Sequence, residues 1–126
     1  MIQKHLPSAQ ALAFLGDAVH TLYVREMLVR RGISHSGDLN REALAYVTAT
    51  AQAAAMERIR EHLTEEEQQV YTRAHNTSHI NRPKHVSGED YRAATGFEAV
   101  LGMLHCIGNQ ERIRELLAIA YRDEAE

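Results

Sequence analysis

Two carboxylates stand out because each is the only charged side chain in a long apolar segment. Asp17 is the only formally charged residue in residues 8–24, and Glu98 is the only one in residues 93–107. A buried carboxylate without a partner is costly and tends to keep its proton. Magnesium offers such groups a partner, because it binds one or two carboxylates together with water and phosphate oxygens. Asp17 and Glu98 are therefore candidate metal ligands, although each could instead be a structural carboxylate on a polar helix face.

A second candidate site is a basic segment, residues 71–88, which contains no acidic residue. Its positive and histidine side chains are Arg73, Arg82, Lys84, His75, His79 and His85. The whole chain has a formal net charge of −3, so it lacks the overall positive charge typical of nucleic-acid-binding proteins. This segment is therefore where a polyanion would bind. The alternative is a solvated loop whose charges only aid solubility.

The elements that must position these residues are helical. The chain has 126 residues, which is one small domain, and it contains only two prolines. Apolar residues recur at three- and four-residue steps, so we expect an all-α fold of about five helices. The expected helices span residues 8–31, 38–63, 64–76, 87–107 and 109–122. Asp17 falls on the first and Glu98 on the fourth, within a single domain 1–126 whose core is about 8–122.

Local signals mark several helix ends and one close contact. Ser8 and Ser87 are expected caps, and the pattern Thr64-Glu65-Glu66-Glu67 is typical of a capping box. Glycines inside a helix cost ~1 kcal/mol each relative to alanine. Gly16 directly precedes Asp17, and Gly96 and Gly102 lie on either side of Glu98. These glycines indicate close packing or close backbone approach at both carboxylates.

The composition also bears on compartment. The single cysteine, Cys106, excludes an intrachain disulfide, and it is expected to be a small core residue rather than a nucleophile. No apolar stretch reaches the ~18 residues that span a bilayer, and the N-terminus lacks a signal peptide pattern. We expect a cytoplasmic protein.

Two motifs carry a resemblance to a known family. Residues 11–19, Ala-Leu-Ala-Phe-Leu-Gly-Asp-Ala-Val, resemble the signature helix of the ribonuclease III catalytic domain. Residues 95–102, Thr-Gly-Phe-Glu-Ala-Val-Leu-Gly, resemble its second acidic motif. Residues 23–25, 73–76 and 91–92 are similar to the short bacterial form, Mini-ribonuclease III, which lacks a double-stranded RNA-binding domain. The resemblance covers roughly residues 8–122.

The resemblance implies a magnesium-dependent endoribonuclease that cleaves double-stranded RNA and leaves a 5′-phosphate and a 3′-hydroxyl. It implies a homodimer with the signature helices at the interface, and a role in maturation of the large-subunit (23S) ribosomal RNA precursor and so in ribosome biogenesis. Asp17 and Glu98 carry over as catalytic metal ligands. Two family carboxylates are replaced here by Ala13 and Thr95, so we expect one tightly held ion per site.

Without a separate binding domain, the catalytic domain must hold the RNA itself. The expected RNA contacts are Arg73, His75, Asn76, Arg82 and Lys84. His20, three residues after Asp17, could support the site but is more simply an ordinary helix histidine. The alternatives to an enzyme are a non-catalytic helical dimer that binds structured RNA, and a helical scaffold without nucleic acid. The paired Asp17 and Glu98 argue against the first, and the acid-free basic segment argues against the second.

Overall fold

The computed structural model describes residues 6–77 and 84–122, which form six α-helices and one short 3₁₀ turn without any strand in those ranges. The elements are α1 (Ala9–Arg30), α2 (Ser36–Val47), α3 (Ala49–Ile59), η2 (Arg60–His62), α4 (Glu65–Thr77), α5 (Gly88–Cys106) and α6 (Gln110–Ala120). The predicted all-α class is confirmed.

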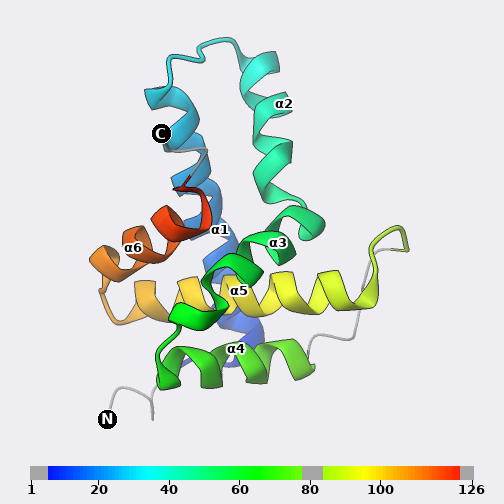
Figure 1. The fold of residues 1–126 in the computed structure, drawn as a ribbon, viewed down its shortest axis with the longest axis vertical. Helices are drawn as coiled ribbons and strands as arrows, with labels where there is room; N and C mark the ends of the chain where they lie inside the picture. The colour runs from blue at the N-terminus through cyan, green and yellow to red at the C-terminus, as the bar shows by residue number, and fades with distance from the viewer. Residues whose placement is uncertain (1–5, 78–83, 123–126) are drawn as a thin grey trace.

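Helix α5 is the centre of the fold. Figure 1 shows α5 running across the body between α4 and α6, with α1 crossing it and the α1–α2 pair projecting as an arm. Nearly every residue of α5 from Ala93 to Leu104 is buried, with Thr95 and Glu98 as the partly exposed exceptions. A helix that is apolar on nearly all sides belongs in the core, so α5 places the partly exposed Glu98 beside that core.

The predicted caps are present. The Ser8 and Ser87 hydroxyls each accept a hydrogen bond from the backbone amide three residues further along the chain. Thr64 and Glu67 cap each other reciprocally: the Thr64 amide donates to Glu67 Oε1 (2.9 Å), and the Glu67 amide donates to Thr64 Oγ1 (3.1 Å). These bonds satisfy amides that the first helical turn leaves free, which sets where α1, α4 and α5 begin.

The predicted helix over residues 38–63 is divided in two, which corrects that boundary. Thr48 is extended (φ −70°, ψ 157°), and its Oγ1 accepts a hydrogen bond from the Ala51 amide (3.2 Å) to start α3. The apolar periodicity continues through this point, so the pattern alone does not show the break. The break lets α2 pack along α1 while α3 packs on α5.

Glu67 also joins two distant helices. The Arg112 guanidinium on α6 forms a paired contact with it, with Nε donating to Oε2 (2.8 Å) and Nη2 to Oε1 (2.9 Å). Burial raises the pKa of Glu67, but the bonds from Arg112 and Thr64 outweigh burial and hold the pKa below its ordinary value. The ion pair therefore fixes the start of α4 against α6.

Cys106 lies exposed at the end of α5, so the expectation that it is a core residue is wrong. The buried positions of α5 end at Leu104, two residues before the helix does. Within residues 6–77 and 84–122, no helix is long and apolar enough to cross a membrane.

Candidate active site

The two candidate ligands meet because α1 and α5 cross with their backbones in contact. A Cβ added at Gly16 would overlap the carbonyl oxygen of Glu98, and one added at Gly102 would overlap the carbonyl oxygen of Leu12. Only glycine allows such an approach at both positions. Asp17 follows Gly16 directly, so the crossing brings its side chain to Glu98. The close packing that the helix glycines indicated is present.

Asp17 and Glu98 interact directly, although their surroundings differ. Asp17 is exposed, whereas Glu98 is partly buried. Burial raises the pKa of Glu98 to about 9, with a smaller contribution from its hydrogen bond to Asp17 and from the Asp17 charge. In the metal-free protein the Glu98 carboxyl is therefore protonated at neutral pH and donates to a carboxylate oxygen of Asp17. The exposed side of the pair, at Asp17, is open to an incoming phosphate.

This donor set fits a hard divalent cation. Two adjacent carboxylate groups that share one proton can both ionise when a cation offsets their charges, and the proton is then released. Among the described residues, no group of three or more His, Cys, Asp or Glu side chains could hold a metal ion. Ala13 is buried, and the Thr95 hydroxyl donates to the carbonyl oxygen of Tyr91 (2.9 Å), so neither position supplies a further acidic ligand.

Gln52 is a polar residue of this site that the sequence analysis missed. It lies on α3, is 2 % exposed, and its amide hydrogen-bonds both the Glu98 carboxyl and His20 Nδ1, the latter at 3.1 Å. His20 is fully buried and its Nε2 lies 2.7 Å from the Tyr121 hydroxyl. The sequence does mark Gln52 as unusual, because it is the one polar side chain among the alanines of residues 51–55.

The candidate RNA contacts are only partly brought together. Arg73 and Asn76 are exposed on the last turns of α4, and Lys84 is exposed ahead of α5. His75 is partly buried; its ring bonds Asn76 Oδ1 (3.1 Å) and Glu89 Oε2 (3.2 Å). Arg82, like His79, lies outside the described residues. The structure thus presents Arg73, Asn76 and Lys84 to solvent, while His75 is engaged by its neighbours.

A comparison with protein families decides the identity of this fold. The model of the family described as the Ribonuclease III domain matches residues 10–109, a range that includes both carboxylates and the glycine crossing between them. The chain belongs to the ribonuclease III family. It is an endoribonuclease of the class that cleaves double-stranded RNA, and this ribonuclease III class depends on divalent metal ions.

Individual relatives of this ribonuclease III chain are the short bacterial form. A Mini-ribonuclease 3 of Symbiobacterium thermophilum is 46% identical over 109 residues, covering 86% of this chain and 84% of the relative. A Mini-ribonuclease 3 of Streptococcus pneumoniae is 41% identical over 120 residues, covering 94% of each. A solved crystal structure of a Fusobacterium nucleatum protein superposes with a TM-score of 0.84 at 30% identity, covering 93% of each chain.

Proposed function

We propose that the chain is a magnesium-dependent endoribonuclease in which Asp17 and Glu98 together hold one Mg²⁺ per chain. The observation that carries this proposal is the direct interaction of the two carboxyl groups across the Gly16 crossing, with Glu98 protonated when no cation is present. A protein that only bound RNA would have no need of two adjacent carboxyl groups, which repel phosphates. Two carboxylates, completed by water and a phosphate oxygen, match the ligand set that magnesium prefers.

The chemistry is hydrolysis of an RNA phosphodiester. Bound magnesium would activate a water and offset the negative charge that develops at the phosphate. Asp17 is exposed and so stands on the side from which the phosphate enters. Glu98 would hold the ion as a carboxylate, and its partly buried surroundings keep that side chain in place. Water attacks phosphorus and the bond from phosphorus to the 3′-oxygen breaks. This leaves the 5′-phosphate and 3′-hydroxyl ends that the family resemblance implies.

RNA binding rests on the exposed basic side chains near the α4–α5 connection. Double-stranded RNA is recognised mainly through phosphate and 2′-hydroxyl contacts, which positive side chains can make without reading sequence. Arg73 and Lys84 are exposed, and Asn76 adds an amide on the same stretch of α4. His75 and Arg82 complete the proposed set, His75 in a lesser role because Glu89 already contacts it.

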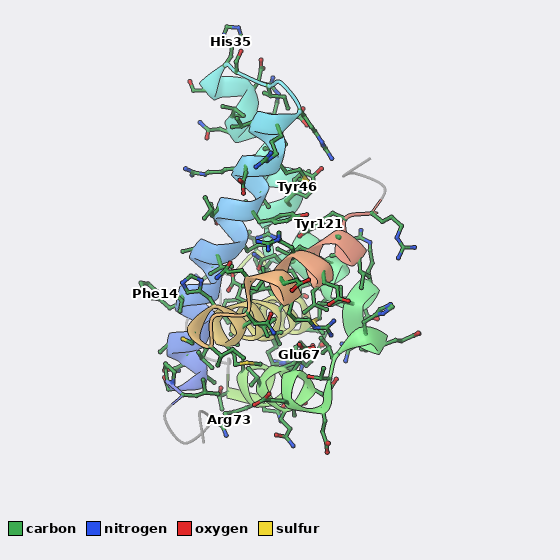
Figure 2. All side chains as sticks on the ribbon, turned by 90° about the vertical axis from the view of Figure 1, so that its left-hand side faces the viewer. Phe14, His35, Tyr46, Glu67, Arg73 and Tyr121 are labelled. Atoms are coloured by element: carbon green, nitrogen blue, oxygen red, sulfur yellow. The ribbon has the colours of Figure 1, made fainter. Side chains whose placement is uncertain are left out.

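The proposed active form is a homodimer that packs through α1. Phe14 is 83% exposed, Leu22 is 67% exposed and Val29 is 60% exposed, all on this helix. Figure 2 shows Phe14 pointing away from the body of the molecule. A groove between α1 and α6 is lined by Leu22, Tyr23 and Ile113 among others, so the exposed apolar surface of α1 continues into it. Large apolar side chains exposed together are the usual sign of a partner surface.

The biological substrate that we propose is the precursor of large-subunit (23S) ribosomal RNA, cleaved in the cytoplasm. This proposal is supported by the likeness to Mini-ribonuclease 3 proteins over most of the chain. The test is to incubate the purified protein with a generic RNA duplex, with the same strands unannealed, and with precursor rRNA, each in magnesium or in EDTA. Magnesium-dependent cleavage of the duplex and the precursor supports the proposal. Equal cleavage in EDTA, or cleavage of the single strands alone, overturns it.

A further inference from the structure

A chain of hydrogen bonds runs from the candidate metal site into the core. It begins at the Glu98 carboxyl on α5, passes to the Gln52 amide on α3, then to the His20 ring on α1, and ends at the Tyr121 hydroxyl just beyond α6. Gln52, His20 and Tyr121 are 2 %, 0 % and 3 % exposed. Four parts of the chain that are far apart in sequence each contribute one polar group to this line.

The direction of each bond can be assigned. The Gln52 side chain hydrogen-bonds the Glu98 carboxyl group, and an ionised carboxylate can only accept, so the Gln52 amide donates an N–H to it. Gln52 Nε2 also lies 3.1 Å from His20 Nδ1, and an amide nitrogen can only donate. His20 Nδ1 is therefore the acceptor, and the ring proton is on Nε2, which donates to the Tyr121 hydroxyl at 2.7 Å.

This pattern fixes the orientation of the Gln52 amide. Both of its N–H groups are used, one toward Glu98 and one toward His20. Rotating the amide by half a turn would place its carbonyl oxygen against two acceptors and remove both bonds. Burial lowers the pKa of His20 to about 4, so the ring stays neutral at neutral pH and keeps its acceptor nitrogen. The His20 ring is in turn held edge-on to Phe97, with ring centroids 5.3 Å apart.

We propose that Gln52 is a positioning residue that holds the Glu98 carboxylate in its metal-binding orientation, with His20 and Tyr121 locking the Gln52 amide from behind. This inference rests on the proposed function, in which Glu98 is a magnesium ligand. Gln52 is the buried neutral side chain that hydrogen-bonds the Glu98 carboxyl from the core side, and His20 holds the same amide from behind. A single amide thus fixes which way the Glu98 carboxyl group faces.

The chemistry of the alternatives favours this role over simple packing. A buried amide without partners costs free energy, and leucine or methionine of similar volume would fill the space without that cost. No buried side-chain nitrogen or oxygen in the described part of the chain lacks a partner. The buried polar groups of this network are thus paired with one another, and the Gln52 amide presents a donor to Glu98 that an apolar residue could not supply.

The test compares Gln52→Met, Gln52→Asn and Tyr121→Phe with wild type. Tyr46→Phe serves as a matched control, because it removes a hydroxyl that contacts Arg31 rather than the network. For each protein, magnesium affinity is measured by the magnesium-induced rise in Tm and by calorimetric titration, and kcat and KM are measured on an RNA duplex. The Tm in EDTA reports stability separately.

We expect Gln52→Met to weaken magnesium binding by about tenfold or more, equivalent to ~1.4 kcal/mol, and to lower kcat while KM for RNA stays close to wild type. Gln52→Asn keeps an amide but falls one methylene short of Glu98, so it should show the same reduction while keeping the core polar. Tyr121→Phe should weaken magnesium binding to a smaller extent, and Tyr46→Phe should leave it unchanged.

Two results separate this inference from the proposed function. If wild type binds magnesium and cleaves, but the Gln52 variants match it in magnesium affinity and kcat, Gln52 is only a packing residue. The same conclusion follows if the loss of magnesium affinity in the four variants simply follows their loss of stability, measured as Tm in EDTA. If wild type itself neither binds magnesium nor cleaves, the proposed function fails first, and the positioning role of Gln52 fails with it.

Discussion

The backbone of Gly16 packs directly on the carbonyl group of Glu98. This approach leaves no room for a Cβ, and it joins the helix that carries Asp17 to the helix that carries Glu98. The site is therefore built by a helix crossing rather than by a loop, so the separation of the two carboxyl groups is set by the core itself.

A Gly16→Ala substitution should disrupt this crossing. The added methyl group meets backbone atoms, which cannot turn aside as a flexible side chain can, so we expect a decrease of ~3 kcal/mol or more in the free energy of unfolding. Magnesium binding should weaken in parallel, because Asp17 and Glu98 are pushed apart. Urea denaturation measures the first effect and calorimetric titration the second.

Gly37→Ala is the matched control for Gly16→Ala. A Cβ at Gly37 has nothing within 4 Å, so this variant should differ from wild type by less than ~1 kcal/mol and keep full activity. Equal stability of the Gly16 and Gly37 variants would show that α1 and α5 do not cross as described.

Replacing Glu98 by a residue that cannot ionise should stabilise the metal-free protein, and more so at higher pH. The pKa of Glu98 is about 9 in the folded chain against 4.5 for the free group, so between these values the folded state binds more protons than the unfolded state. The stability that Glu98 contributes is complete below the lower pKa and is lost as pH rises through the higher one. Glu98→Gln has no proton to release and escapes this decline.

The corresponding measurement is the Tm of wild type and Glu98→Gln in EDTA from about pH 6 to about pH 9. We expect the Tm of the variant to exceed that of wild type by a margin that grows steadily across this range. Two curves that stay parallel would mean that Glu98 is ionised throughout, and the assignment of a shared proton with Asp17 would be wrong.

Several features were predictable because their chemistry is local. The Thr64–Glu67 capping box needs only four consecutive residues, and the isolation of Asp17 and Glu98 in apolar helices is visible in the sequence. The break at Thr48 was not predictable from periodicity, since the apolar positions continue through it and only the packing of α3 on α5 requires the extended residue.

The role of Gln52 was hidden for a different reason. Its bonds to Glu98 and His20 depend on how α3, α5 and α1 meet, and no sequence spacing relates these residues. The spacing of His20 from Asp17 is common on any helix, so it does not distinguish a supporting residue from an ordinary helix histidine. Leu22 follows the three- and four-residue apolar spacing of the first helix, yet it is exposed, because His20 and Val24 take the neighbouring buried positions.

Phe14→Asp should convert the proposed dimer to monomers. The Phe14 side chain is 83% exposed, so the change costs the isolated chain little, but a charge at the centre of an apolar interface is strongly unfavourable. Sedimentation equilibrium should give twice the chain mass of 14.2 kDa for wild type and the single mass for the variant. Ala54→Asp, at an exposed position of α3, should remain dimeric. A monomeric wild type, or a dimeric Phe14→Asp, would exclude this interface.

The double variant Arg73→Ala with Lys84→Ala should raise the KM for duplex RNA more than it lowers kcat. Both side chains are exposed and would touch phosphates rather than the reacting group. The salt dependence of binding should also become shallower, because fewer RNA phosphates are neutralised in the complex. Arg41→Ala, at an exposed position of α2, controls for a general change of charge. An unchanged KM and salt slope would move the RNA surface elsewhere.

The most direct measurement of the central claim is duplex cleavage by wild type and Asp17→Asn over a range of magnesium concentrations, with duplex binding measured beside it. We predict that wild type cuts only with magnesium, and that Asp17→Asn binds RNA and melts like wild type but neither cuts nor shows the magnesium-induced rise in Tm. Cleavage by Asp17→Asn at the wild-type rate would contradict the account, because Asp17 and Glu98 would then not hold the ion that the reaction needs.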